Sequence, residues 1–340
     1  MKFSNLKQSI LMQFAVPGGN KVVPFIMGKP GGGKSSCARE IAAALAEKLS
    51  IPKERIVEFN PSLREPSDIL GLPDLAGECA RWVPPAELYA LRQGVGPCIL
   101  IIEELSDAQM DMQNPMCRII LDRYAGQLEL SSELYIIATG NRTEDRSGAS
   151  RLSTKLANRM RILNFEEDLD DWMKWAGNHD VNPVLRAFIS FRPNLLSDFA
   201  PKRALNPTPR AWEDVGRIPD GMEPSVFMEH VKGCVGEGAA AEYVGFVKLF
   251  NELPDIDDIV RHPETAELPE QVSIRYAVVG KLLTVIKKTN FSGVYKYVGR
   301  LNPEFVVLFM KGAGDSPKTR WVMRTPEWAD FASKYKEVMF

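Results

Sequence analysis

The sequence has few residues of the kinds that bind metals or form disulfides. Its three histidines, His179, His230 and His262, are far apart and lack the spacing of a metal site. Its five cysteines are odd in number and include no CxxC pair. The cysteine pattern predicts free thiols in a reducing compartment. The histidines, which are far apart, are assigned no role. The cysteines are Cys37, Cys79, Cys98, Cys117 and Cys234.

The sequence also lacks an excess of charge and a long apolar run. Its 42 basic and 44 acidic side chains give a net charge of -2, so the whole chain has no general attraction to nucleic acid or anionic membranes. The net charge does not exclude a local basic patch. No uninterrupted apolar stretch approaches the roughly 20 residues that cross a bilayer. The amino-terminal apolar patch is interrupted by Gln8, Ser9 and Gln13, and no cleavage-like site follows it, so we expect a cytoplasmic protein.

The composition is that of a globular protein with more than one core. The chain has 340 residues, 45% of them apolar and 25% charged, which suits two or three domains. Before Phe165, short apolar runs alternate with amphipathic or alanine-rich stretches. This alternation predicts an α/β domain whose parallel sheet is buried between two layers of helices. The expected strands are 22–27, 55–59, 98–102 and 134–139, and the first expected helix is 35–49.

The second half of the chain is helical and aromatic. Beyond Phe165, strand-like runs are scarce and segments such as "LDDWMKWAGN" have a helical period. The acidic, proline-containing segment 253–269 is predicted to be a surface connection. We expect three parts: an α/β domain over 1–165, a helical lid over 166–250 and a helical extension over 251–340. Trp172, Trp175 and Trp212 are expected in the core of the lid.

A glycine-rich stretch, "GKPGGGKS" over residues 28–35, separates the first expected strand from the first expected helix. In this context the pattern G-x-x-x-x-G-K-S predicts a phosphate-binding loop, because glycines let the backbone approach phosphate oxygens and the helix start offers free amides. Lys34 is expected to contact the β- and γ-phosphates, and Ser35 to bind Mg²⁺. The residues expected to bind the nucleotide are Gly28, Pro30, Gly31, Gly32, Gly33, Lys34, Ser35 and Ser36.

Polar side chains follow two of the later strands. Glu103 and Glu104 come directly after the run 98–102, at the strand end where ligands bind in open α/β sheets. Hydrolysis needs a carboxylate near the metal and a group that orients water. Glu103 is therefore expected to hold a metal-bound water and Glu104 to polarise the attacking water. Asn141, after the run 134–139, is expected to hydrogen-bond that water or the γ-phosphate.

With "LANRM" at residues 156–160, these motifs resemble those of the AAA+ ATPases, and within them the MoxR-like, dynein-related group. The resemblance covers about residues 20–215. It implies that Lys34 and Ser35 form Walker A, that Glu103 and Glu104 form Walker B, and that Asn141 is sensor 1. The family's usual residue at the first Walker B position is Asp, so Glu103 is a departure that adds one methylene.

The resemblance also implies two arginines that act on the γ-phosphate. Arg159 occupies the place of the arginine finger, which reaches the nucleotide of the neighbouring subunit. Arg210 resembles the sensor 2 arginine, which acts on the subunit's own nucleotide. The finger assignment stays open between Arg159, Arg151 and Arg146, because "NRTEDRS" over 141–147 also resembles a segment of the GTP-cleaving subunit of a modification-dependent restriction system.

Two further segments are similar to hairpins of the same group. Residues 66–91 resemble the insertion before Walker B, and residues 126–139 the hairpin before sensor 1. In related ATPases such hairpins face the axis of a ring. Trp82 and the turn Leu72–Leu75 are therefore candidates for substrate contact, with local packing as the alternative.

The resemblance implies an ATPase that uses Mg²⁺ and assembles into a ring of identical subunits, expected to be a hexamer. Its turnover would remodel or activate a separate client or adaptor protein, for which a partner with a von Willebrand A domain is one expectation. Two alternatives stay open. One is a nucleotide-gated assembly module with little hydrolysis, and the other is a GTP-dependent translocase of a restriction-like system.

Overall fold

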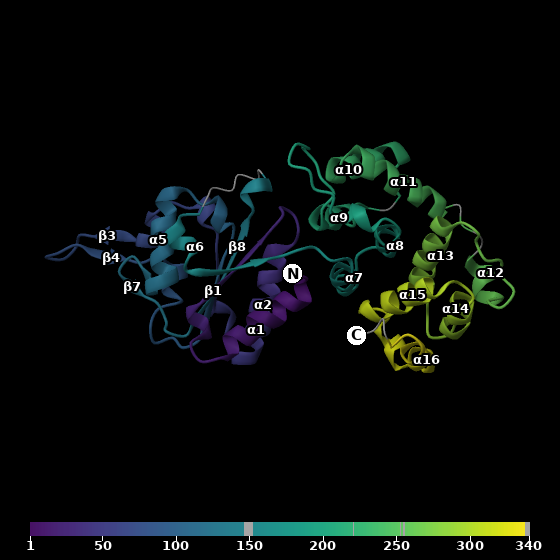
Figure 1. Cartoon of the computed structure of the whole chain (residues 1–340), viewed down its shortest axis with the longest axis horizontal. Coiled ribbons are helices and arrows are strands. Elements are labelled where there is room, and N and C mark those ends of the chain that lie inside the picture. Colours follow the sequence, from purple (N-terminus) through teal and green to yellow (C-terminus); the bar gives the residue numbers. More distant parts are fainter. Residues whose placement is uncertain (146–151, 220, 252, 254–255, 337–340) are drawn as a thin grey trace. The chain divides into compact units, whose positions relative to one another are not determined.

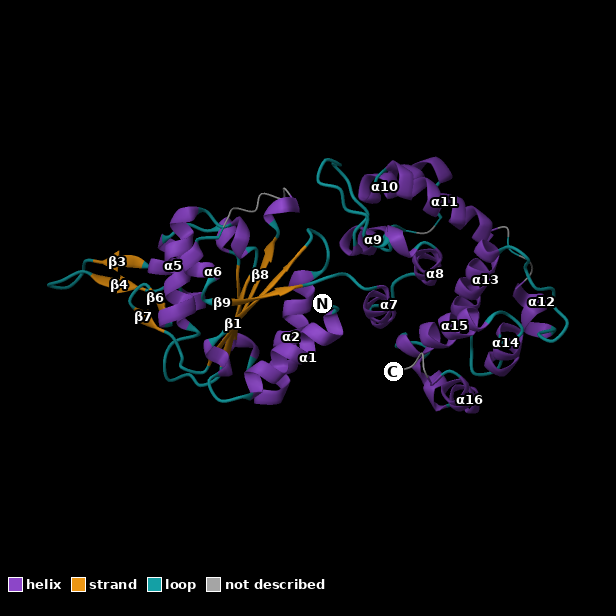
Figure 2. Ribbon diagram, viewed as in Figure 1, coloured by secondary structure: helices purple, strands orange, loops and turns teal. Residues whose placement is uncertain are grey.

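The computed structural model describes residues 1–145, 152–219, 221–251, 253 and 256–336 (Figure 1). The chain divides into two compact units, Met1–Glu167 and Asp168–Phe340. The first is an α/β unit and the second is helical, as Figure 2 shows by its colours. A further division of the helical half near residue 250 remains a prediction.

The α/β unit is built on a five-stranded parallel sheet. The strands follow the order β2-β5-β8-β1-β9, which is typical of P-loop proteins. In register, Phe59 pairs with Ile102 and Gly28 pairs with Asn141, so the carboxyl ends of four strands meet at one edge. The strands are β1 (Val23–Gly28), β2 (Ile56–Phe59), β5 (Cys98–Ile102), β8 (Leu134–Asn141) and β9 (Met160–Asn164).

Helices cover both faces of this sheet and bury it, as the apolar runs predict. On one face, α1 (Phe3–Ala15) and α2 (Lys34–Leu49) pack on isoleucines of three strands. On the other face, α5 (Met110–Asp122) packs on side chains that alternate with those isoleucines along the strands. The expected α/β fold with a doubly covered parallel sheet is confirmed.

One strand of the sheet was not among the expected ones. β9 is an edge strand, and it follows the four-residue helix α6 (Thr154–Ala157). None of its residues is fully buried, and Arg161 and Asn164 are exposed. A strand of this kind has no continuous apolar run, so the signal that identifies the central strands is absent here.

Two small hairpins lie outside the main sheet. β3 (Leu72–Asp74) and β4 (Arg81–Val83) pair in antiparallel fashion, with all six residues exposed, and Figure 1 shows this hairpin projecting from the α/β unit. It lies within the predicted insertion 66–91, between α3 (Ser67–Leu70) and α4 (Ala86–Tyr89). The second hairpin joins β6 (Tyr124–Ala125) to β7 (Leu128–Glu129).

The helical unit contains two hydrophobic clusters that share one helix. Trp172 and Trp212 are buried in the first cluster and Trp175 packs against it, which confirms their expected place in a core. α13 contributes Ala277 to this cluster and Val278 to the second one. The helices are α7 (Leu169–Asn178), α8 (Pro183–Phe191), α9 (Pro209–Val215), α10 (Pro224–Val235), α11 (Glu237–Asn251), α12 (Ile256–Arg261), α13 (Val272–Val285), α14 (Phe291–Val298), α15 (Pro303–Asp315) and α16 (Pro326–Lys334).

The prediction that 253–269 is only a surface connection is wrong in part, because α12 lies within it. Ile259 of this helix is buried in the second cluster, and Asp257 and Asp258 occupy its first turn. Carboxylates there are favourable next to the helix N-terminus. Some of the acidic residues of this segment therefore lie at the start of a helix, and not only in a surface connection.

The sequence also makes predictions about the cysteines and about membrane-spanning segments. All five cysteines are free, as predicted. Among the helices that the structure describes, none is both long enough and apolar enough to span a membrane.

Candidate nucleotide-binding site

The glycine-rich loop joins the end of β1 to the start of α2. Gly31 and Gly33 have φ angles of 72° and 100°, in the left-handed region that glycine adopts without a steric penalty. Gly33 is the N-cap of α2, a 16-residue helix with no acidic residue in its first turn. The first amides of a helix have no partner within it, so this helix start can bind an anion such as a phosphate.

The loop lysine is held next to Asn141. Lys34 is buried, and its Nζ donates hydrogen bonds to the Lys29 carbonyl oxygen at 2.6 Å and to Asn141 Oδ1 at 2.8 Å. Asn141 is the last residue of β8, directly beside Gly28 in the sheet. The sheet register therefore brings together two residues that are 107 positions apart in the sequence.

Asn141 is fixed on its other sides by the turn that follows β5. Its backbone N–H donates to Ser106 Oγ at 2.7 Å, and its Nδ2 donates to Asp107 Oδ2 at 3.0 Å. Ser106 Oγ also donates to Asp107 Oδ1 at 2.8 Å. Lys34 of α2 binds the amide oxygen of Asn141, and Asp107 in the turn after β5 binds its amide nitrogen. These two hydrogen bonds fix the orientation of the Asn141 side chain.

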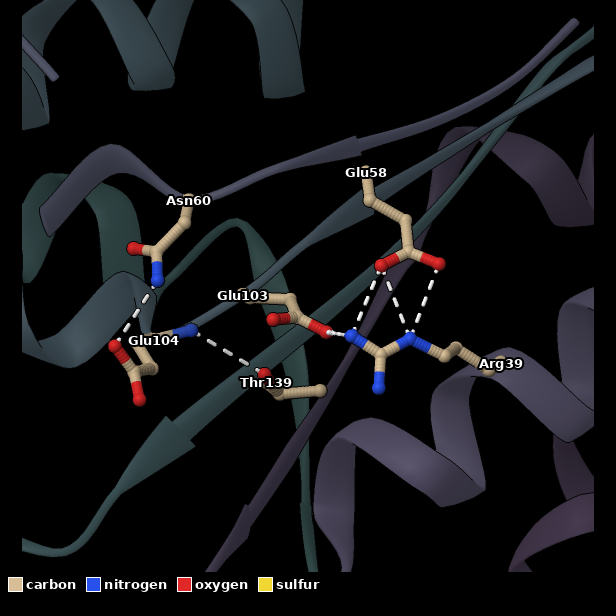
Figure 3. Close-up of polar contacts among 6 residues, drawn as sticks. All are labelled: Arg39, Glu58, Asn60, Glu103, Glu104 and Thr139. Atoms are coloured by element: carbon tan, nitrogen blue, oxygen red, sulfur yellow. Dashed lines mark hydrogen bonds and ion pairs between the residues drawn. The ribbon is translucent and has the colours of Figure 1, made fainter. Parts of the chain in front are cut away.

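Glu104 is constrained in both backbone and side chain (Figure 3). Its φ is 51°, which is uncommon for a residue with a Cβ, and its N–H donates to Thr139 Oγ1 at 3.3 Å. Its Oε2 accepts from Asn60 Nδ2 at 3.0 Å and from Ser62 Oγ at 3.3 Å. The carboxylate therefore has one oxygen held by residues that follow β2.

Glu103 is held by an arginine on the phosphate-loop helix. Arg39 Nη2 donates to Glu103 Oε1 at 2.7 Å, and Arg39 Nε donates to both oxygens of Glu58 at 3.0 and 3.1 Å (Figure 3). The hydrogen bond to Glu58 raises the pKa of the Arg39 guanidinium above its ordinary value, against a smaller lowering by desolvation. Glu103 is mostly buried, with 17% of its side chain exposed.

The oxygen donors at this edge fit a Mg²⁺ ion that arrives with a nucleotide. Ser35 is in the first turn of α2, and Glu103 Oε2 has no hydrogen bond from the part of the chain that the structure describes. Within those same residues, no group of three or more His, Cys, Asp or Glu side chains can hold a metal. Mg²⁺ commonly takes one or two protein ligands and fills its shell with phosphate oxygens and water. A serine hydroxyl and one carboxylate match that pattern.

A cavity of about 430 Å³ adjoins the loop at the carboxyl ends of β1, β8 and β9. Met27 lines it and directly precedes Gly28, so the cavity begins where the loop begins. Its size is in the range of small-molecule sites. The other lining residues are Arg142, Thr143, Glu144, Asn164 and Glu166.

Arg159 is not brought to the loop of its own chain. Arg159 precedes β9, whose first residue, Met160, pairs with Val23 at the start of β1. Arg159 therefore lies at the amino edge of the sheet, roughly 16 Å of strand away from the loop edge. It is exposed, and within the described ranges its guanidinium has no hydrogen-bond or ion-pair partner.

Arg210 lies in the first turn of α9, in the helical unit, and is exposed. The alternatives for the finger, Arg146 and Arg151, are outside the described residues.

Several residues of the site are not predicted from the sequence. Asn60 directly follows β2, so the rule that identified Asn141, a polar residue after a buried strand, also applies to it. Asp107 lies three residues beyond Glu104 in the same turn. Arg39 and Glu58 carry no comparable signal, because their contact depends on the packing of α2 beside β2 and β5.

One family of known proteins matches the part of the chain that contains this site. Residues 24–160 match the family described as AAA domain (dynein-related subfamily). The solved structures include NtrX from Brucella abortus, at 15% identity and a TM-score of 0.37, covering 98% of this chain and 67% of that one. None of the curated proteins matches. The segment that matches the dynein-related subfamily of AAA domains carries the phosphate loop, the acidic pair and Asn141.

Proposed function

We propose that this protein binds ATP with Mg²⁺ at the loop 28–35 and hydrolyses it, using the turnover to remodel a partner protein. One observation carries the proposal. Lys34, Asn141 and Glu104 come from three separate elements, and the sheet brings them to one edge beside an open helix start. This arrangement supplies a phosphate cradle, a positive charge and a carboxylate within one hydrogen-bonded network.

Each side chain has a role in the proposed reaction. The amides of the loop and Lys34 bind the phosphates, and Asn141, hydrogen-bonded to Lys34, orients the attacking water or the γ-phosphate. Glu104 polarises that water through the oxygen that Asn60 leaves free. Ser35 and Glu103 would hold Mg²⁺, which when bound neutralises charge on the phosphate oxygens.

We further propose that the site is completed by a neighbouring subunit of a ring, expected to be a hexamer. Arg159 is exposed at the sheet edge opposite the loop, which favours action on another subunit over action on its own. An arginine supplied in this way increases the rate by a factor of about 10³ to 10⁵ in comparable reactions. Arg210 is proposed to contact the nucleotide from the helical unit.

The β3–β4 hairpin supports contact with a protein client. Leu72, Leu75 and Trp82 are exposed by 67%, 74% and 42%, and solvent-exposed apolar side chains gathered on one projecting element are typical of interaction sites. The client or adaptor, including one with a von Willebrand A domain, would act as a separate chain.

A second function, a nucleotide-gated assembly module with little hydrolysis, is favoured by a specific observation. Glu103 is bound to Arg39, and Glu104 to Asn60 and Ser62, so both carboxylates have hydrogen-bonded partners within the protein itself. If the partners of Glu104 hold its carboxylate away from the attacking water, the site binds ATP without activating that water.

One experiment separates these functions. We expect wild-type protein to bind ATP and release phosphate at a rate per subunit that rises with protein concentration, because the arginine comes from a neighbour. Lys34→Ala should bind ATP weakly and serve as the control. Binding without turnover at any concentration would favour the assembly module, and a strong preference for GTP in competition would favour the translocase.

A further inference from the structure

Arg39 links two carboxylates that come from neighbouring strands. It lies on α2, one turn beyond the loop, and contacts Glu58 of β2 and Glu103 after β5. The contacts with Glu58 are two-pronged, through Nε and Nη2, at 2.9 to 3.1 Å. Figure 3 shows the guanidinium between the two acids, with the second oxygen of Glu103 turned away from it.

Stability alone does not account for this arrangement. About half of each side chain of the Arg39–Glu58 pair is exposed, 48% and 44%. Exposed ion pairs contribute roughly 0–1 kcal/mol and are weakened further by salt. Bidentate geometry adds geometric specificity as well as energy. The contacts with Glu58 instead fix the position of the Arg39 guanidinium.

The fixed position of the Arg39 guanidinium matters because the same group holds the Glu103 carboxylate. A Glu has one more rotatable bond than an Asp, so its carboxylate samples more positions and loses more entropy when a metal fixes it. The hydrogen bond from Arg39 fixes Oε1 at 2.7 Å. Oε2 accepts no hydrogen bond from the described residues and is the oxygen that remains for a metal ligand.

We propose that Arg39 is a positioning residue for the metal side of the site, an inference that rests on the proposed function. It holds Glu103 through Oε1, which leaves Oε2 as the oxygen that would bind the Mg²⁺ of a nucleotide. Glu58 has two effects: it fixes the guanidinium, and its charge offsets that of Arg39, which would otherwise repel the cation. Partners that orient a metal ligand in this way commonly determine metal affinity.

The test is a Mg²⁺ titration of the binding of a fluorescent ATP analogue, without a readout of turnover. For Arg39→Ala we expect the apparent Mg²⁺ affinity to fall about tenfold, in line with losses at comparable sites. Binding of the analogue in EDTA should not change. Arg39→Lys should give an intermediate loss, since one ammonium cannot reproduce the fork geometry. Glu58→Gln should give a smaller loss than Arg39→Ala.

The matched control is Arg64→Ala, which removes an arginine of the same unit paired with Glu87 at 3.1 Å and similarly exposed. It should leave the titration unchanged. In the Glu103→Gln background, Arg39→Ala should cause no further loss. Unchanged or higher Mg²⁺ affinity in Arg39→Ala, or equal weakening in EDTA, would overturn the positioning role. Failure of the wild-type protein to bind the analogue at all would overturn the proposed function itself.

Discussion

At the scale of single residues, the site depends on a few side chains held in defined positions. Glu104 keeps a left-handed backbone, a conformation that costs about 1–3 kcal/mol for a residue with a Cβ. Its N–H is bound by Thr139, its C=O accepts from the Asp107 N–H at 2.8 Å, and its carboxylate is bound by Asn60. Such strain persists only where the surroundings fix it, which is typical of functional positions.

Gly140 separates two site residues, Thr139 and Asn141, and leaves no space for a side chain. A Cβ there would lie 2.5 Å from Phe25 Cζ and 2.9 Å from Ser106 Oγ. Because Phe25 is fully buried, its ring cannot move away at low cost. We expect Gly140→Ala to lower the free energy of unfolding by about 1–3 kcal/mol, measured by chemical denaturation.

The control for this substitution is Gly233→Ala, in α10, where nothing beyond the nearby backbone of the helix itself lies within 4 Å of the added methyl. An alanine in a helix is favoured over glycine by about 0.5–1 kcal/mol, so this variant should be slightly more stable than the wild type. Equal effects of the two substitutions would contradict the close packing inferred around Gly140.

At the scale of elements, the β3–β4 hairpin is anchored by one glycine. Gly71 has a φ of 84°, and a Cβ there would lie 2.2 Å from the carbonyl oxygen of Val83. Val83 pairs with Leu72, so its carbonyl cannot move without disturbing the hairpin. We expect Gly71→Ala to raise the rate of proteolysis within 72–83 and to leave ATP binding unchanged.

Gly77→Ala, at the hairpin tip, is the matched control because its nearest atom is 3.6 Å away. It should be cleaved at the wild-type rate. Loss of ATP binding in Gly71→Ala would show instead that the hairpin is needed for the phosphate loop to fold.

Elements were predictable from the sequence where burial leaves a simple pattern. The central strands β1, β5 and β8 are buried on both faces and appear as apolar runs. The edge strand β9 and the acidic helix α12 have mixed patterns and were not identified. Their existence depends on neighbours far along the chain: β9 pairs with β1, and Ile259 of α12 packs into a cluster formed mostly by later helices.

At the scale of the whole molecule, the sequence predicts where the residues proposed to face the ligand lie, but it does not predict the residues that support them. Lys34, Glu104 and Asn141 stand at strand or helix ends, where position along the chain indicates position in space. Arg39 and Glu58 lie within elements, so only packing shows that they meet Glu103.

Arg159 leads to a prediction about assembly. Its place at the opposite sheet edge separates it from the loop of its own chain. We expect Arg159→Ala and Lys34→Ala each to be inactive, and their mixture to recover part of the ATPase activity. In the mixture, an intact loop from one subunit can meet an intact arginine from another.

The control replaces the Lys34→Ala partner by a chain with both substitutions, which supplies no arginine and should give no recovery. Absence of recovery in the first mixture would exclude Arg159 as the residue that acts between subunits, and would leave Arg146 and Arg151 as the candidates.

The central claim is that this edge of the sheet binds ATP and hydrolyses it with Glu104. The most direct measurement compares ATP binding and phosphate release in wild-type protein and in Glu104→Gln, which keeps the shape of the side chain and one oxygen for Asn60. We predict equal ATP occupancy in both proteins and phosphate release in the wild type alone. Phosphate release by Glu104→Gln at the wild-type rate would contradict the account.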